Sequence, residues 1–231
     1  MKDPFLVTVS PDKTNLIFRV APYESLETTF RPVIDEPKRQ RVRMEKTLIY
    51  CQKQETCARL YLLFRLHLDN EFTEPIGYPD LPQFRLVDMF TSGTHATTKE
   101  MIIASFSSPS DSNCKLRVLI STVAFGMSVN PSDVHQIYHC GPPNDSEMYV
   151  QEVGRGGRNG LPTVATLYYA KTLKRFVDQG MIDFAEQSTV CRKDMLFNDF
   201  DMYKHSSANI GCNCCDICAM TCKCDKCSVH V

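Results

Sequence analysis

Short apolar runs alternate with amphipathic stretches along most of the 231 residues of this chain. Runs of apolar and β-branched residues predict strands, and apolar positions that recur every three or four residues predict helices. Strands are expected at residues 5–9, 16–20, 47–51, 85–90, 116–122, 134–140 and 164–169, and helices at residues 55–68, 97–106 and 148–153. Because right-handed crossovers place helices outside a parallel sheet, this alternation predicts an α/β fold with one parallel sheet covered by helices on both faces.

Two of the helices begin with residues that can satisfy unpaired backbone N–H groups. Thr97 and Glu100 have the spacing of a capping box, and Asn144 with Glu147 can cap the later helix in the same manner. Residues 69–83 contain three prolines and a glycine, which interrupt both periodicities and predict a loop.

Composition and charge narrow the class of protein. With 43% hydrophobic residues, the chain can form the core of one ordinary domain and carry a small appendage. The net charge of -1 provides no overall attraction to nucleic acid, so DNA contacts must depend on local clusters of lysine and arginine. The most basic cluster, residues 38–46, is expected to be a solvated lead-in to a strand; contact with DNA phosphates or a role in nuclear import is the alternative.

Contact with a membrane is not expected. No apolar run approaches the roughly 20 residues that a spanning helix needs, and the N-terminus lacks the apolar core of a signal peptide. A soluble intracellular protein is therefore expected.

The stretch from 119 to 160 carries the most informative chemistry. An apolar strand ends at Ser121 and Thr122, a loop containing Gly126 follows, and after a second strand and a helix the chain reads G-R-G-G-R-N-G. Ligands of parallel sheets commonly bind at one loop edge, so we expect the hydroxyls and the arginines to share a loop face. Phosphates are the ligands that these groups favour.

Arg155 and Arg158 are the candidate phosphate ligands. A planar guanidinium binds phosphate through two N–H bonds, and an arginine that reaches a transferring phosphoryl group raises the rate by orders of magnitude. The glycines at 154, 156, 157 and 160 leave no side chain to block a close approach. The alternative is a glycine-rich surface turn with solvated arginines.

Two ordered segments resemble a known family. Residues 121–133, S-T-V-A-F-G-M-S-V-N-P-S-D, and residues 151–160, Q-E-V-G-R-G-G-R-N-G, are similar to motifs V and VI of the RecQ family of superfamily 2 helicases, which unwind DNA with ATP. Both arginines of the second motif are intact. The chain departs from the family pattern, which has glycine, aspartate, alanine and aspartate there, at Ser128, Asn130, Gly156 and Asn159.

The resemblance implies the second RecA-like lobe of an ATP-dependent DNA helicase that moves 3′ to 5′ on single-stranded DNA and unwinds duplex DNA, with ATP and Mg2+ at the motor site. It implies a nuclear protein of DNA repair or recombination, with the cytoplasm as the alternative location. The residues carried over are, for catalysis, Arg155 and Arg158; for nucleotide binding, Gln151, Gly126 and Asn130; and for DNA binding, Ser121 and Thr122. For the two hydroxyl residues, a strand-terminal cap is the alternative role.

The sequence contains only half of an ATP site. Neither a G-x-x-x-x-G-K-[ST] phosphate loop nor a D-E-x-H motif for Mg2+ occurs in it. A first RecA-like lobe with Walker A and B motifs is therefore expected, upstream in a longer protein or in a partner. Two other functions stay open: a truncated, zinc-stabilised module that binds DNA or protein without turnover, and a DEAD-box-like RNA helicase lobe, which Gln151 and the cysteines disfavour.

Eight of the twelve cysteines lie at or after Cys191, which favours a metal site in a reducing compartment over disulfides. Four thiolates around Zn2+ form a closed structural site that stabilises a small subdomain. The zinc region of RecQ helicases is similar, and it implies zinc ligation by Cys191, Cys212, Cys215 and Cys218. The remaining cysteines of this region could hold a second metal with His205 or His230, or belong to a cysteine-rich tail: Cys214, Cys222, Cys224 and Cys227.

The expected organisation has three parts: a lead-in and inter-lobe connection at 1–46, the helicase lobe at 47–172, and a helical zinc subdomain with a cysteine-rich tail at 173–231. His135 and His139 alternate with apolar residues along a strand. They are expected to share one face as hydrogen-bonded side chains, in preference to acting as a base or metal ligands.

Overall fold

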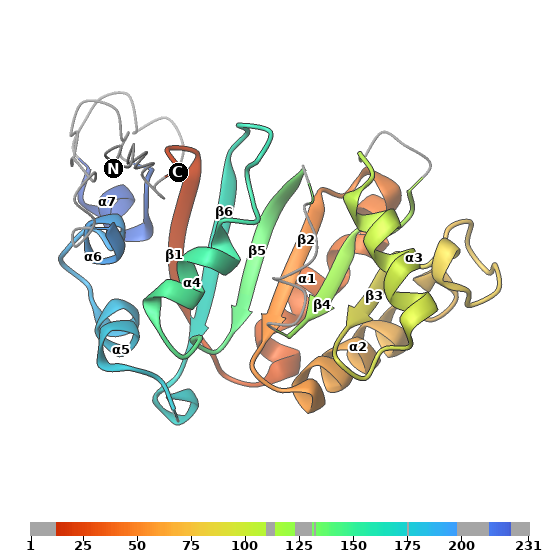
Figure 1. Ribbon diagram of the computed structural model, residues 1–231, viewed down its shortest axis with the longest axis horizontal. Helices are drawn as coiled ribbons and strands as arrows, with labels where there is room; N and C mark the ends of the chain where they lie inside the picture. The colour runs from red at the N-terminus through yellow and green to blue at the C-terminus, as the bar shows by residue number, and fades with distance from the viewer. Residues whose placement is uncertain are drawn as a thin grey trace, which may run out of the picture.

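Six parallel strands form one sheet in the computed structural model, which describes residues 13–109, 114–122, 131, 133–174, 176–197 and 213–222 (Figure 1). The strands are β1 (Leu16–Pro22), β2 (Lys46–Cys51), β3 (Val87–Phe90), β4 (Val118–Ser121), β5 (Val134–Cys140) and β6 (Thr163–Tyr169). Their order across the sheet is β1-β6-β5-β2-β4-β3, and every pair of neighbours is parallel. The strand predicted at residues 5–9 lies outside the described residues.

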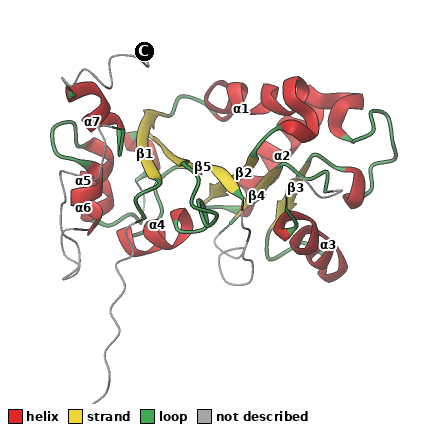
Figure 2. Cartoon of the chain, turned by 90° about the horizontal axis from the view of Figure 1, so that it is seen from above, coloured by secondary structure: helices red, strands yellow, loops and turns green. Residues whose placement is uncertain are grey.

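Helices cover both faces of the sheet. They are α1 (Leu26–Gln40), α2 (Gln54–Leu68), α3 (Ala96–Ser107), α4 (Ser146–Val153), α5 (Gln179–Glu186), α6 (Arg192–Phe197) and α7 (Asp216–Thr221). Helices α1 and α2 lie on one face, and α3 and α4 lie on the other (Figure 2). Within β2, Leu48 packs into the core on the α4 side and Ile49 into the core on the α1 side, as strand alternation requires. The predicted fold class is confirmed.

Among the described residues, every helix is too short or too polar to cross a bilayer.

Helix α1 is absent from the predicted elements because Pro32 and Pro37 lie inside it. An interior proline removes a backbone hydrogen bond and costs roughly 3 kcal/mol. Ser25 caps the first turn by accepting a backbone N–H, and the fully buried Phe30 and Ile34 face the sheet. Burial of such side chains offsets the cost of the prolines. The structure thus places β1 and α1, which the sequence assigns to the lead-in, within the lobe.

The outer edge of β1 is covered by the cysteine-rich segment. The Phe18 N–H donates to the Cys214 carbonyl oxygen (3.0 Å), and the Val20 N–H donates to Oδ2 of Asp216 (3.0 Å) in α7. An uncovered edge strand would present unpaired backbone groups to other chains. The segment from 213 to 222 therefore closes this end of the sheet.

Both predicted helix caps are wrong. Asp145, rather than Asn144, caps α4, because its Oδ1 accepts a backbone N–H at 2.7 Å. Helix α3 starts after His95 without any side-chain hydrogen bond to its cap, and Thr97 Oγ1 contacts the His95 ring (2.9 Å). The cap is decided by the backbone angles of the residue before the helix, which a spacing pattern does not specify.

Candidate functional site

Residues 154–160, here named the arginine loop, follow α4 and pack against the sheet. The Gly157 N–H donates to the carbonyl oxygen of Val134, the first residue of β5 (3.1 Å). A Cβ atom at Gly156 would lie 2.5 Å from Cγ2 of Thr163 on β6, and Gly157 has a φ of 61°. Glycine suits both positions because it has no Cβ and adopts positive φ without strain. The loop backbone is therefore closely packed, unlike a loose surface turn.

Arg155 is half-buried and Arg158 is exposed on this backbone. Partial burial and the positive charge of Arg155 lower the pKa of Arg158, so the two guanidinium groups lie near each other. Burial raises the pKa of Tyr50 in β2, and the positive charges of Arg155 and Arg158 act on that pKa in the opposite direction. Two guanidinium groups on one short loop create a local positive potential, and an anion with several acceptor oxygens, such as a phosphate, complements them.

The hydroxyls and the arginine loop do not share one loop face. Ser121 is the last residue of β4, whereas the loop backbone contacts Val134 at the start of β5. Because all strands are parallel, these positions lie at opposite edges of the sheet. The predicted common edge is wrong, because α4 runs back along the sheet before the arginines begin. Their side chains nevertheless lie within electrostatic range of Tyr50, whose register partner in β4 is Ser121.

The other predicted ligand residues lie on different elements, and two of them fall outside the described residues. Ser121 is fully buried. Its Oγ lies 2.8 Å from the Phe90 carbonyl oxygen and 2.7 Å from the Thr122 carbonyl oxygen, which is the geometry of a strand-terminal cap. Thr122 follows it and is half-buried, and Gln151 is exposed on α4. Gly126 and Asn130 lie outside the described residues, as does Ser128.

A buried histidine–glutamate pair joins β5 to α4. His139 Nε2 is 3.0 Å from Oε2 of Glu152, and the ring stacks on Tyr50 with centroids 5.2 Å apart. His135 instead contacts the Pro162 carbonyl oxygen (3.1 Å). Both histidines thus have a hydrogen-bonding partner, as predicted, although Nδ1 of His139 is buried without one. Glu152 is not among the predicted site residues; its only signal in the sequence is its place three residues before Arg155 in a short predicted helix.

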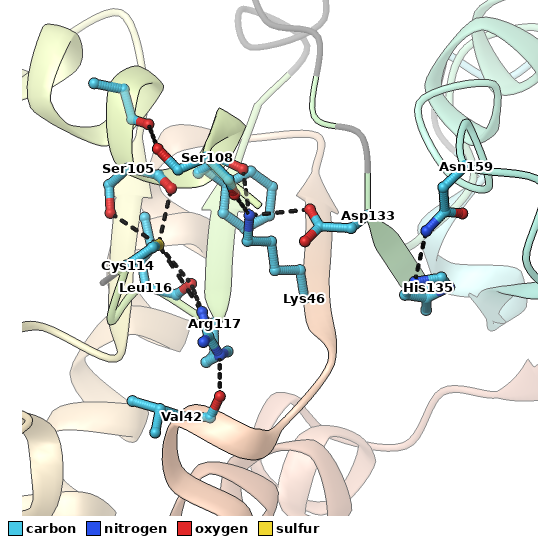
Figure 3. A network of polar contacts seen from close by, with 12 residues as sticks. Val42, Lys46, Ser105, Ser108, Cys114, Leu116, Arg117, Asp133, His135 and Asn159 are labelled. Carbon is cyan, nitrogen blue, oxygen red and sulfur yellow. Dashed lines mark hydrogen bonds and ion pairs between the residues drawn. The ribbon is translucent and has the colours of Figure 1, made fainter. Parts of the chain in front are cut away.

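Lys46 connects the start of β2 to the segment that enters β5 (Figure 3). Its Nζ lies 3.0 Å from Oδ1 of Asp133 and 2.9 Å from the Phe106 carbonyl oxygen, and it also donates to the Ser108 carbonyl. The side chain is fully buried. The prediction that the basic cluster at 38–46 is solvated is therefore wrong for Lys46, because an adjacent carboxylate and two carbonyls replace its water.

Replacing Lys46 with alanine should lower the free energy of unfolding by about 3 kcal/mol, because it leaves the Asp133 carboxylate without its buried cation. Lys38→Ala is the matched control, since Lys38 pairs with Glu71 at the surface, with 46% and 34% of their side chains exposed. Its loss should cost at most about 1 kcal/mol. Urea unfolding of both variants measures the difference, and equal costs would contradict a structural role for Lys46.

Four thiols come together between α6 and α7. The Sγ atoms of Cys191, Cys214, Cys215 and Cys218 lie within 4.8 Å of one another, and those of Cys191 and Cys214 are 3.7 Å apart. Sulfurs about 2.3 Å from a tetrahedral zinc ion are about 3.8 Å from each other, so this donor set fits Zn2+. Hydrogen bonds from Cys191 and Cys214 lower the pKa of Cys215, which favours the thiolate that binds metal.

Three of the four predicted zinc ligands, Cys191, Cys215 and Cys218, belong to this cluster. Cys212 lies outside the described residues, and so do Cys224, Cys227, His205 and His230. Cys214, which the spacing leaves unassigned, is the fourth thiol within reach. Its carbonyl is bound to the edge of β1, and this tertiary contact was not visible in the sequence.

Arg192 connects the helices around the thiols. Its Nε and Nη2 donate to the two carboxylate oxygens of Asp216 (2.6 and 3.0 Å), and its Nη1 donates to the Phe184 carbonyl oxygen in α5 (2.6 Å). The guanidinium is buried, and the paired geometry is the strong form of such a contact. Helices α5, α6 and α7 are thereby held together next to the cysteines.

Comparison with known families gives one match that covers more than half of the chain. Residues 29–160 match the family described as the helicase conserved C-terminal domain. This span includes α1 from its fourth residue onward, the strands β2, β3, β4 and β5, and the whole arginine loop.

Among curated proteins, the chain is similar to ATP-dependent DNA helicase RecQ of Haemophilus influenzae, with 34% identity over 45% of this chain and 19% of that protein. It is also similar to ATP-dependent DNA helicase Q4 of Homo sapiens, with 27% identity over 79% of this chain and 15% of that protein. The matched region thus spans about a fifth or less of these relatives.

Solved structures show the same fold at low identity. One is S. cerevisiae Dbp5 bound to RNA and ADP BeF3, with a TM-score of 0.50, 14% identity, and coverage of 68% of this chain and 36% of that chain. Another is the DUF1998 helicase MrfA bound to DNA, with a TM-score of 0.51, 12% identity, and coverage of 67% and 20%.

Proposed function

The chain belongs to the helicase conserved C-terminal domain family, and we propose that it is the second motor lobe of a RecQ-type DNA helicase whose arginines complete an ATP site. The observation that carries this proposal is the arginine loop. Arg155 and Arg158 lie close together on a glycine backbone that packing against β5 and β6 keeps in place. Guanidinium groups positioned in advance stabilise charge on a transferring phosphoryl group without reorganising during the step.

The proposed roles combine the position of the arginine loop with the resemblance of the two motifs to the RecQ family. Arg155 and Arg158 contact the γ-phosphate of ATP, while Gln151, Gly126 and Asn130 contribute to nucleotide binding. A first lobe, upstream or in a partner, contributes the phosphate loop and the residues that hold Mg2+. Ser121 and Thr122 are the proposed DNA contacts at the end of β4; Thr122 is the stronger candidate because the hydroxyl of Ser121 faces two backbone carbonyls.

The coupled activity is translocation along single-stranded DNA, with duplex unwinding as its result. Closure of the two lobes on ATP and their reopening after hydrolysis would step the protein 3′ to 5′. Support comes from the curated relatives, which are named as ATP-dependent DNA helicases. The proposed location is the nucleus, and the proposed process is DNA repair or recombination.

Zn2+ is the proposed structural metal of the cysteine cluster. Cys191, Cys215 and Cys218 are three of the proposed ligands, and Cys214 is the fourth thiol within reach among the described residues. Bound zinc would join α6 to α7 by four sulfur bonds and so keep residues 213–222 against β1.

The fourth ligand can be identified by substitution. Cys214→Ser should reduce the zinc content of the purified chain from about one equivalent to well below one, because a closed site with three thiolates binds the ion more weakly. Cys212→Ser should retain one equivalent. Zinc release measured with a chromophoric chelator distinguishes the two variants. Loss of zinc from Cys212→Ser alone would identify Cys212 as the fourth ligand, as the spacing predicts.

The motor function is tested by DNA-stimulated ATP hydrolysis in a protein that carries this chain together with a first lobe. Single-stranded DNA should stimulate hydrolysis more than RNA of the same length. Stimulation by RNA instead would favour a DEAD-box-like lobe. Binding of DNA or of a protein partner with no hydrolysis at all would favour the zinc-stabilised binding module.

A further inference from the structure

Two side chains from the segment before β1 hold the arginine loop by its backbone carbonyls. Lys13 Nζ donates to the carbonyl oxygens of Gly154 (2.8 Å) and Gly156 (3.1 Å). Asn15 Nδ2 donates to the carbonyl oxygens of Gly157 (2.8 Å) and Leu161 (2.7 Å). The loop therefore receives three hydrogen bonds, and the residue after it a fourth, from residues that lie at the other end of the chain.

The bonds from Lys13 act on carbonyls at and just after the end of α4, and those from Asn15 act on the turn that follows, where the Gly157 carbonyl also accepts from the Gly160 N–H (3.1 Å). Gly154 ends α4, where the last carbonyls have no partner within the helix and carry a partial negative charge. The Lys13 ammonium group donates to the Gly154 carbonyl and to that of Gly156, two residues further on. Asn15 then fixes the next turn, where a Cβ atom on Gly157 would lie 2.3 Å from Asn15 Nδ2. Lys13 and Asn15 together restrict the backbone on both sides of Arg155 and just before Arg158.

Lys13 also lies close to the guanidinium groups. Burial, followed by the charges of Arg158 and Arg155, lowers the pKa of Lys13. Three neighbouring cations repel one another, and the loop would relax to separate them if the carbonyl bonds were absent. The bonds from Lys13 therefore keep the arginines concentrated in one place.

A third contact joins this arrangement to the thiol cluster. Lys193 lies in α6, two residues after Cys191, and is fully buried. Its Nζ donates to the carbonyl oxygen of Lys13 (2.9 Å). A continuous series of contacts thus runs from the cysteine cluster through Lys193 and Lys13 to the arginine loop.

We propose that Lys13 and Asn15 are positioning residues for Arg155 and Arg158, and that Lys193 makes the order of the arginine loop depend on the thiol cluster. The consequence for ATP rests on the proposed function, since it is there that the arginines contact phosphate. The order of the loop itself does not, and it can be measured in the chain without nucleotide or DNA.

Amide hydrogen exchange of the whole chain tests the positioning role. In Lys13→Met, which keeps the length of the side chain but removes its donors, the amides of Gly157 and Gly160 should exchange about tenfold faster. Lys13→Arg should restore slow exchange, because a guanidinium can donate to the same carbonyls. Lys99→Met is the matched control: Lys99 Nζ donates to the Ser92 carbonyl oxygen in another loop (3.0 Å), so its loss should leave the arginine loop unchanged.

The amides of β2 and β4 report whether each variant folds. If Lys13→Met speeds exchange there as well, Asn15→Asp replaces it, since a carboxylate oxygen cannot donate to the Gly157 and Leu161 carbonyls. Exchange in the arginine loop that matches the unmodified chain in a folded Lys13→Met or Asn15→Asp variant would overturn the proposal. Failure of the Arg substitution to restore slow exchange would do the same.

The link to the thiol cluster is tested by adding a zinc chelator to the two proteins. Chelation should speed exchange of the arginine loop in the unmodified chain, with a smaller further effect in Lys13→Met, because the two changes act on one series of contacts. Equal effects in both proteins would show that Lys193 and Lys13 transmit nothing. In a two-lobe protein, Lys13→Met should lower the kcat for ATP more than it changes KM; an inactive two-lobe protein with the expected exchange results would refute only the motor function.

Discussion

Replacing Arg158 with alanine should lower the kcat of ATP hydrolysis about a thousandfold in a protein that carries both lobes. The reason is electrostatic: charge develops on the phosphoryl oxygens in the transition state, and a guanidinium fixed beside them stabilises that charge more than it stabilises bound ATP. Arg155 and Arg158 lie close together, so Arg155→Ala should also reduce kcat. Steady-state hydrolysis with saturating single-stranded DNA measures both.

Two further variants separate the chemistry of the guanidinium from its charge. Arg158→Lys keeps the positive charge but loses the planar pair of donors, so it should recover only part of the lost rate. Arg39→Ala is the control, because Arg39 pairs with Glu36 at the surface with 66% of its side chain exposed. Arg158→Ala with an unchanged DNA-stimulated rate would remove the basis for an ATP site at this loop.

Removing the metal should detach the segment that closes the sheet. Structural zinc sites bind their ion with an apparent free energy of roughly 10–16 kcal/mol in small peptides, and that energy is folding energy. The Phe18 and Val20 N–H groups are bonded to Cys214 and Asp216. After chelation these two amides should lose protection from hydrogen exchange, while amides of β2 and β4 stay protected. Exchange measured residue by residue, with zinc content followed in parallel, gives the result.

Cysteine variants serve as the matched comparison. Cys215→Ser should have the same effect as chelation, because Cys215 belongs to the cluster and is 1% exposed. Cys222→Ser should keep both the metal and the protected edge, because Cys222 lies outside the group of four. If Phe18 and Val20 stay protected after complete removal of zinc, the helices alone hold the segment, with Arg192 and Asp216 the main remaining contact.

The sequence by itself determined the fold class and most strands. β5 has the predicted bounds, and the other described strands differ by a few residues, because apolar runs buried on both faces of a parallel sheet are visible without any tertiary information. It also marked the glycines and arginines of the loop, since only glycine suits the close approach at Gly156 and the positive φ at Gly157.

Only the tertiary structure decided which groups meet. Helix α1 forms despite two interior prolines because one of its faces is buried, and burial depends on partners remote in the chain. Lys46 becomes a buried cation because Asp133 lies beside it, and Lys13 reaches the arginine loop across 141 residues. A local sequence pattern does not show such long-range contacts. The fold therefore determines the charge environment, burial and hydrogen bonding of these residues.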